Sequence, residues 1–135
     1  MLNKKNSRMA VAALALTLAL TLGGFGAAHA ANVAKGKSVF AAQCAACHSA
    51  AAGQNGIGPS LAGIYGKPAA STKGFMFSPA LKSSHIVWTS AALDKFVANP
   101  QADVPGTKMP YMGMPNAKQR ADVVAYIKTL GTTAK

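Results

Sequence analysis

Apolar residues recur at helical spacing in three segments of the chain: an early, a middle and a late one. Five residues of the early segment follow one another at intervals of three or four positions: Val33, Gly36, Phe40, Cys44 and Cys47. Residues at that spacing lie on one face of an α-helix, and Asn32 before them is of a type that caps helices. The pattern predicts a helix that starts after Asn32 and ends at the cysteines.

The late segment, residues 116–131, predicts another helix. Asn116 is a plausible cap, Gly131 is a typical stop, and four residues form the apolar face: Val123, Val124, Ile127 and Leu130. The middle segment predicts a shorter helix between a cap at Thr89 and the break at Pro100. Its buried side carries Leu93, Phe96 and Val97. Because no alternating strand pattern of useful length appears, the sequence indicates an all-α fold.

Two long segments rich in glycine and proline separate the helices, residues 51–79 and 101–115. Loops of this length are uncommon in a compact domain unless they carry a function. Three short helices also give a small domain little to pack into a core. We therefore expect a single domain whose centre is filled by a large apolar group that the chain itself does not supply.

The first 30 residues have the features of a secretory signal. A basic segment, residues 1–8, leads into an uncharged apolar run and then the small-residue site Ala-His-Ala at residues 28–30. We predict cleavage after Ala30 and a mature single domain over residues 31–135. The alternative is a retained membrane anchor, because residues 9–28 are long enough to span a bilayer.

The chain is strongly basic, with a formal net charge of +11 and only three acids: Asp94, Asp103 and Asp122. Cleavage would remove three basic residues and no acid, which lowers the charge to +8. Such a surface is drawn to an acidic protein face, an anionic membrane or nucleic acid, and export makes nucleic acid the weakest of these. The lysines are scattered singly, so an ordinary solvated surface also fits.

Both cysteines stand in one short motif, Cys44-x-x-Cys47-His48. This spacing is that of c-type haem attachment: two thiols at a helix end reach the two vinyl groups of a porphyrin and form thioethers. The next residue then lies under the ring, where the His48 imidazole can serve as an axial ligand of the iron. The motif predicts one covalently bound haem c.

Three other interpretations of the cysteines are weaker. A disulfide between Cys44 and Cys47 would close a very small loop and leave His48 unexplained. A thioredoxin-like redox pair expects a βαβ context that the sequence lacks. Zinc would need a fourth ligand, and His85 is the only other histidine after residue 30.

The second long loop offers three methionines for the sixth position of the iron: Met109, Met112 and Met114. Met109 is favoured because Pro105, Gly106 and Pro110 restrict the backbone around it. Gap-filling core is the usual role of methionine and remains the alternative. A neutral thioether favours reduced iron, which suits an electron carrier.

The chain resembles class I cytochromes c, the group of mitochondrial cytochrome c and bacterial cytochromes c2 and c550. The similarity runs in order through KGKSVFAAQCAACH, GIGPSLAGIYGK, GFMFSPAL, VWTSAALDKFVANP, VPGTKMPYMG and ADVVAYIKTL. It implies the class I cytochrome c fold, with three main helices and long loops around one covalent haem whose edge alone reaches solvent. The first and last helices would cross where Gly36 and Phe40 meet Tyr126.

The resemblance also implies roles for individual residues. His48 and Met109 would be the axial ligands, and the Pro59 carbonyl would accept a hydrogen bond from the imidazole. Trp88 would donate to a buried haem propionate, although a plain core tryptophan would look identical in sequence. Lys67 stands near the propionates, where the family usually has arginine, so a point charge replaces a bidentate group.

The chain departs from the family in its haem pocket and at the haem edge. Phe77 and Phe96 stand where mitochondrial proteins carry tyrosines, and Leu81 replaces an asparagine, so those hydrogen bonds to haem and ligand cannot form. Three residues replace family lysines near the exposed edge: Gln43, Gln101 and Ala102. Lys37 and Lys108 are retained, which predicts a docking surface less basic than the net charge suggests.

We expect a monomeric periplasmic electron carrier, not an enzyme, that is not inserted in a membrane after cleavage. Its partners would be a membrane cytochrome complex, an oxidase or a dehydrogenase, docked transiently near the haem edge, with no nucleic acid. One alternative is a haem enzyme or ligand-binding protein in which Met109 is displaced. Against it, the only spare histidine, His85, is expected in an exposed loop. A second alternative is a dedicated haem subunit of one membrane complex.

Overall fold

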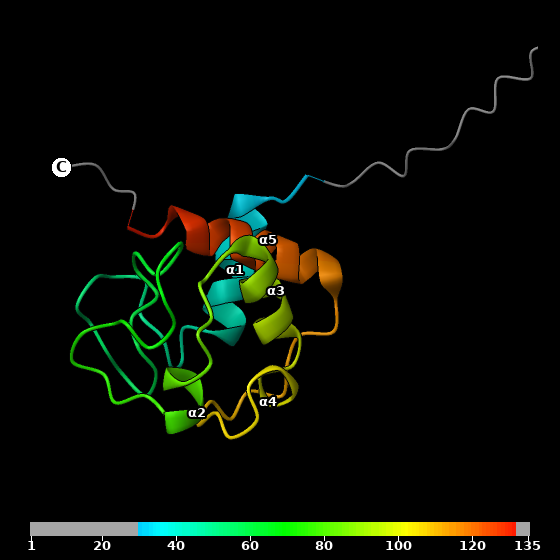
Figure 1. Cartoon of the computed structure of the whole chain (residues 1–135). Helices are drawn as coiled ribbons and strands as arrows, with labels where there is room; N and C mark the ends of the chain where they lie inside the picture. Colours follow the sequence, from blue (N-terminus) through cyan, green and yellow to red (C-terminus); the bar gives the residue numbers. More distant parts are fainter. Residues whose placement is uncertain (1–29, 132–135) are drawn as a thin grey trace, which may run out of the picture.

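The computed structural model describes residues 30–131. Residues 1–29 of the predicted signal segment lie outside the described residues, so the signal and its cleavage after Ala30 stay predictions. This part of the chain forms five helices: α1 (Val33–Gln43), α2 (Pro79–Lys82), α3 (Ser90–Ala98), α4 (Pro100–Asp103) and α5 (Ala117–Thr129). The long connection between α1 and α2 forms the left part of the molecule in Figure 1, and the connection from α4 to α5 runs along its lower edge. Residues 30–131 contain no strand beyond an isolated antiparallel bridge of Pro68 with Val87. The all-α prediction is confirmed.

Each helix begins at a side chain that accepts a hydrogen bond from its first turn. Asn32, Thr89 and Asn116 cap α1, α3 and α5, as the sequence predicts. The short helices α2 and α4 were not expected. They begin with Ser78 and Asn99, each followed by a proline at the first helical position, where a missing N–H costs nothing.

The first and last helices cross in contact (Figure 1). At the crossing, the ring of Phe40 meets the ring of Tyr126 edge to face, with centroids 5.4 Å apart. A side chain at Gly36 would collide with the carbonyl of Asp122 and lie 2.9 Å from Cβ of Tyr126. Glycine is therefore required at Gly36 by close backbone approach, which confirms the expected crossing.

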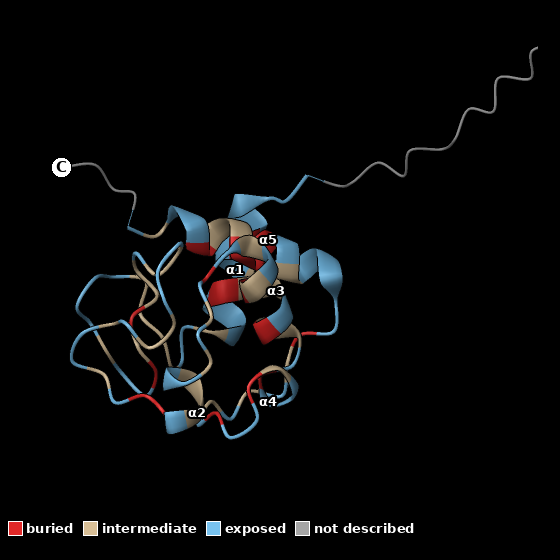
Figure 2. Cartoon of the chain, viewed as in Figure 1, coloured by how far each residue is buried: buried red, intermediate tan, exposed pale blue. Residues whose placement is uncertain are grey.

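The core lies between α1, α3 and α5 and extends toward the loops (Figure 2). It contains nine buried residues: Phe40, Trp88, Leu93, Phe96, Val104, Met114, Val123, Val124 and Ile127. The faces predicted for α3 and α5 are thus largely confirmed. Val33 is the exception on α1, since 43% of its surface is exposed at the start of the helix.

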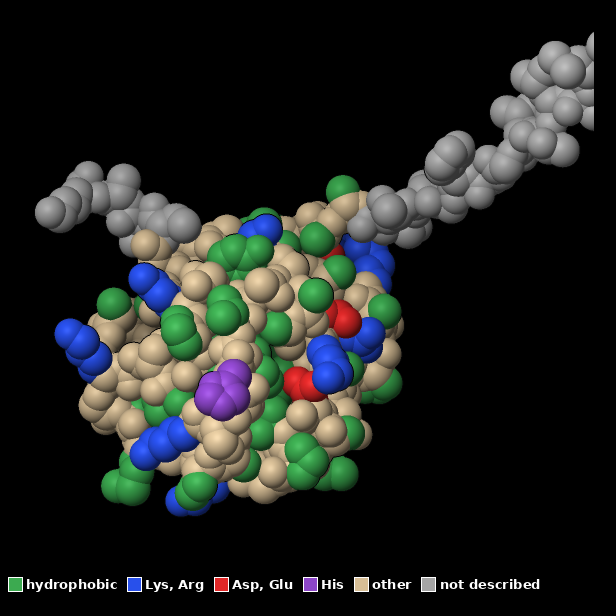
Figure 3. Space-filling model, viewed as in Figure 1, with side chains coloured by type: hydrophobic (Ala, Val, Ile, Leu, Met, Phe, Trp, Pro, Cys, Tyr) green, Lys and Arg blue, Asp and Glu red, His purple; other side chains and the backbone are tan. Residues whose placement is uncertain are grey.

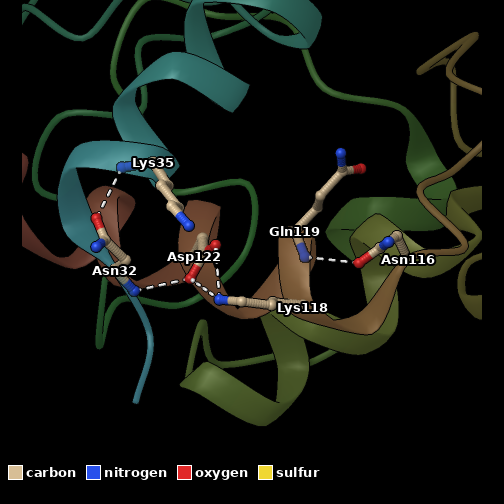
Figure 4. A network of polar contacts seen from close by, with 6 residues as sticks. All are labelled: Asn32, Lys35, Asn116, Lys118, Gln119 and Asp122. Atoms are coloured by element: carbon tan, nitrogen blue, oxygen red, sulfur yellow. Dashed lines mark hydrogen bonds and ion pairs between the residues drawn. The ribbon is translucent and has the colours of Figure 1, made fainter. Parts of the chain in front are cut away.

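A buried carboxylate ties the start of α1 to α5 (Figure 4). The backbone N–H of Asn32 donates to Oδ1 of Asp122 at 2.7 Å, and Lys118 Nζ lies 3.4 Å from Oδ2. The Asn32 hydrogen bond is the main cause that lowers the pKa of Asp122 below its ordinary value, and Lys118 adds to it. Sequence reasoning did not predict this contact, because Asn32 and Asp122 are 90 residues apart and no spacing rule links them.

Candidate functional site

A cavity of about 440 Å³ opens between the end of α1, α3, α5 and the two long loops. Its walls are mostly apolar, and eight residues that the sequence analysis assigned to the haem site line it: Cys44, Cys47, His48, Pro59, Phe77, Trp88, Phe96 and Met109. Leu81 and Lys108 also reach it. The core therefore has the large central space that the short helices predicted, in the size range of small-molecule and cofactor sites.

The cysteines stand at the turn that follows α1. The helix ends at Gln43, Cys44 is its C-cap, and the N–H groups of Cys47 and His48 both donate to the Cys44 carbonyl, at 3.0 and 2.9 Å. Cys47 therefore lies in the turn and not on the helical face that its spacing suggested. This turn brings both thiols and the imidazole to the same cavity wall.

Burial raises the pKa of the Cys44 thiol to about 11, and the neighbouring Cys47 adds to the shift. The thiol is therefore protonated at neutral pH. A redox-active or zinc-binding cysteine needs a stabilised thiolate, which this environment disfavours. Within residues 30–131, moreover, no group of three or more His, Cys, Asp and Glu could hold a metal ion.

The His48 ring is held from two sides. Its Nδ1 lies 2.8 Å from the carbonyl oxygen of Pro59, so Nδ1 carries the proton and donates it. That tautomer leaves the lone pair on Nε2, the state required of a neutral imidazole that ligates iron. The structure contains the contact between His48 and Pro59 that the resemblance implies.

Gly58 forms the second constraint on the ring, and sequence reasoning missed it. The N–H of Gly58 donates to the Cys47 carbonyl at 2.9 Å, which draws the loop against the His48 ring. A Cβ at Gly58 would collide with Cε1 and lie 2.6 Å from Nδ1 of His48. The only sequence signal is the position of this glycine directly before Pro59.

Met109 is half-buried and lines the same cavity, in a loop segment without regular structure. The amide of Gln101 donates to the Met109 carbonyl, and the Tyr111 hydroxyl donates to Oε1 of Gln43 at 2.7 Å. Of the other methionines, Met114 is 1% exposed and belongs to the core, whereas Met112 is 91% exposed. Met109 is the one of the three that reaches the cavity.

Aromatic side chains form much of the remaining wall. Trp88 packs against Phe96 with ring centroids 5.2 Å apart, and Phe77 packs against Phe75 at 4.9 Å. Trp88 is 8% exposed, and its indole N–H has no hydrogen-bond partner in the described part of the protein. No fully buried side-chain nitrogen within residues 30–131 lacks a partner, so the indole nitrogen reaches open space. Because Trp88 lines the cavity, its N–H is available to a group bound there.

Two predicted residues lie away from the cavity wall. Lys67 is exposed and is not among the lining residues, so its expected position near the propionates stays a prediction. His85 is exposed in a loop with φ +54, as expected, and does not line the cavity either.

The acids of the chain are all neutralised by basic partners. Asp94 pairs with Arg120 at 2.8 Å, Asp103 with Lys95 at 2.6 Å, and Asp122 with Lys118. On the face in Figure 3, acidic side chains lie beside basic ones, and other basic side chains are spread singly around the molecule. The positive charge is therefore left mainly on isolated surface lysines. None of the helices within residues 30–131 is long and apolar enough to cross a membrane.

The residues that line the cavity fit a covalently attached haem. Two thiols and an oriented imidazole share one wall, an apolar space lies beside them, and a thioether reaches the same space. In c-type cytochromes, thioether bonds to cysteines fix the haem, and histidine and methionine are a known axial pair.

Comparison with known proteins agrees with this geometry. The family model described as cytochrome c matches residues 33–131. Cytochrome c of Euglena viridis is 43% identical over 96 residues, 71% of this chain and 94% of the relative. Cytochrome c2 of Rhodopila globiformis is 44% identical over 96 residues, 71% of this chain and 91% of the relative.

A solved structure, cytochrome cH from Methylobacterium extorquens, is 41% identical. It superposes with a TM-score of 0.68 over 73% of this chain and 98% of its own. The resemblance in sequence and the similarity in fold thus extend over nearly all of the described residues. The chain belongs to the cytochrome c family as a class I member, and covalently bound haem c is its cofactor.

Proposed function

We propose that this haem-based electron carrier uses His48 and Met109 as axial ligands and transfers single electrons between redox proteins in the periplasm. When bound, the haem supplies the Fe(II)/Fe(III) couple. The protein fixes the ligands, keeps water from the iron and presents the edge of the cofactor to its partners. No substrate bond is made or broken, so the protein is an electron-transfer protein and not an enzyme.

The observation that carries the ligand assignment is the orientation of His48 beside a cavity that Met109 also lines. The Pro59 carbonyl fixes the proton on Nδ1, and Gly58 leaves no room for the ring to tilt toward the loop. Nε2 is therefore the donor atom for iron. The mostly apolar walls, including Phe77 and Phe96, exclude water from the space between the two ligands.

The axial pair is tested by visible spectroscopy of the purified protein, oxidised and reduced, with and without carbon monoxide. Wild type is expected to show six-coordinate c-type haem with the weak far-red band of methionine-ligated Fe(III), and to leave carbon monoxide unbound. Met109→Ala is expected to lose the band and to bind carbon monoxide. Met112→Ala is the matched control, because Met112 is 91% exposed. Ready binding of carbon monoxide by wild type would instead establish an open sixth site and favour a ligand-binding function.

The location and the domain boundary rest on the leader in residues 1–30. Mass spectrometry of the exported protein is expected to give residues 31–135 plus one haem, in the periplasmic fraction. Retention of the leader in the membrane fraction would identify it as an anchor. Co-purification with a membrane oxidase or dehydrogenase at high salt would identify a dedicated subunit, because a transient carrier dissociates when its charges are screened.

A further inference from the structure

The backbone around Met109 has little hydrogen bonding of its own. Among the described residues, those at positions 105–113 take part in one backbone–backbone hydrogen bond, in which the Thr107 N–H donates to the Val104 carbonyl at 3.0 Å. The Met109 N–H reaches only the Thr107 hydroxyl, at a long 3.4 Å. A loop with so few internal bonds needs side chains from elsewhere to fix its path.

Gln101 supplies two such bonds. Its amide Nε2 donates to the carbonyl of Thr107 at 3.1 Å and to the carbonyl of Met109 at 3.0 Å. Both partners are acceptors, so the amide nitrogen, and not its oxygen, must face the loop. One side chain thus holds the backbone at Met109 and two residues before it.

The base of this contact is rigid although α4 is short. The Asn99 side chain accepts from the Ala102 N–H at 3.1 Å, and Pro100 is buried at the first helical position. Asp103, whose side chain is 6% exposed, pairs with Lys95 of α3 at 2.6 Å. Gln101 therefore projects from a turn that is fixed to the core helices.

The other side of the loop has a separate connection. Tyr111 lies two residues after Met109, and its hydroxyl donates to the Gln43 side chain at the end of α1. Gln43 and Gln101 thus engage the same segment from α1 and α4. These are two of the positions at which the chain has glutamine in place of a family lysine, and here the side chains hold the loop.

We propose that Gln101 is a positioning residue that keeps the Met109 thioether in place through the hydrogen bonds to the Thr107 and Met109 carbonyls. The proposal rests on the proposed ligation of iron by Met109. Loss of both donors would loosen the loop and let an external ligand compete with the thioether. The experiment therefore measures that competition in the haem-loaded protein, together with a control for global stability.

Gln101→Glu is the sharpest variant, because it keeps the shape but places carboxylate oxygens against two carbonyls. Imidazole is titrated into the ferric protein at neutral pH while the far-red band is followed. Without the two hydrogen bonds, imidazole is expected to bind about tenfold more tightly than in wild type. Gln101→Ala, which removes the donors without adding charge, is expected to change the affinity in the same direction.

Gln119→Glu is the control, because it makes the same charge change at an exposed position of α5. Thermal unfolding of all variants is recorded beside the titration. Imidazole affinities of Gln101→Glu and Gln101→Ala that match Gln119→Glu would overturn the proposal, even if thermal stability falls. If Met109→Ala leaves the far-red band of wild type unchanged, the ligation itself fails, and the two failures are thereby distinguished.

Discussion

At the scale of single residues, Gly58 shows how a missing side chain shapes the haem site. The glycine lies against the His48 ring, and a Cβ there would collide with it. Gly58→Ala is expected to push the imidazole away from the Pro59 carbonyl and to destabilise the protein by about 1–3 kcal/mol, as overpacking does. The variant should also show a perturbed haem spectrum. Denaturant unfolding and visible spectra of the purified protein measure both effects.

Gly56→Ala is the matched control for this change. Gly56 lies in the same loop, its φ is not in the left-handed region, and a Cβ would meet only the Cys47 carbonyl, at 3.3 Å. We expect a smaller loss of stability and an unchanged spectrum. Equal effects of the two substitutions would mean that the loop responds to any added methyl group, and that Gly58 has no specific relation to the ring.

Trp88 carries a second prediction at this scale. Its ring packs against Phe96 and its N–H has no protein acceptor within residues 30–131. Trp88→Phe is expected to cost about 1–2 kcal/mol of stability through lost packing. If the N–H donates to a haem propionate, its loss leaves that negative charge less compensated, which favours ferric iron and lowers the midpoint potential. Potentiometry that finds no shift would show a core tryptophan without that role.

At the scale of helices and loops, a structural feature can be predicted from the sequence when residues close to it in the chain determine it. The caps at Asn32, Thr89 and Asn116 and the apolar faces of α3 and α5 follow from neighbouring residues, and all were predictable. The short helices α2 and α4 have no room for a periodic pattern. Only the pairs Ser78-Pro79 and Asn99-Pro100 mark them, and such pairs are also common in turns.

The haem site likewise has features that a local motif predicts and features that depend on distant segments. The Cys-x-x-Cys-His motif is local and identified the haem-attachment turn directly, whereas the position of Pro59 beside His48 required the resemblance to a known family. Gly58 and Gln101 depend on how distant segments meet in three dimensions. No spacing rule links Gln101 to the Met109 carbonyl, because Met109 lies in a loop and α4, which carries Gln101, is too short for a periodic pattern.

The contact between α1 and α5 carries a pH prediction through Asp122. The pKa of this carboxyl is lowered from 3.8 in the folded protein, chiefly by the Asn32 N–H. A lowered pKa means that the stabilisation is present above the ordinary value and is lost as pH falls through the folded value. Asp122→Asn is therefore expected to lower stability at neutral pH, and the difference from wild type should shrink as acid is added.

Denaturant unfolding at pH 7 and at successively lower pH measures this difference. Asp94→Asn is the control, because it removes the same charge at a site away from the crossing of α1 and α5. Asp94 pairs with Arg120, and its side chain is 45% exposed. We expect a smaller effect from it at neutral pH. If wild type and Asp122→Asn differ in free energy of unfolding by the same amount at every pH, the stabilisation does not come from the charge of Asp122 and must come from packing.

At the scale of the whole molecule, charge decides how partners approach. Each acid is paired, so the positive field comes from lysines scattered over the surface. Lys108 is the exposed lysine that lines the cavity. Two explanations of fast docking then compete: the net charge of the whole protein, or the local charge at the cavity opening. They predict different results for lysines at different places.

Small inorganic oxidants separate the two explanations, because they need no protein partner. Lys108→Gln is expected to slow oxidation of the reduced protein by anionic ferricyanide about two- to threefold at low salt. The same variant should speed oxidation by a cationic cobalt complex, and both effects should shrink as salt screens the charges. Stopped-flow absorbance gives the rates.

Lys35→Gln makes an equal change in net charge on α1, beside Asp122 and outside the cavity wall. If electrons leave at the cavity opening, Lys35→Gln should change the ferricyanide rate much less than Lys108→Gln at an ionic strength of about 0.1 M, because interactions over more than a Debye length of about 10 Å are then largely screened. Equal effects at that ionic strength would instead make net charge the controlling property. The glutamines at positions 43 and 101 would then cost no more in encounter rate than the loss of a lysine elsewhere on the surface, whereas their hydrogen bonds to the Met109 segment position the ligand.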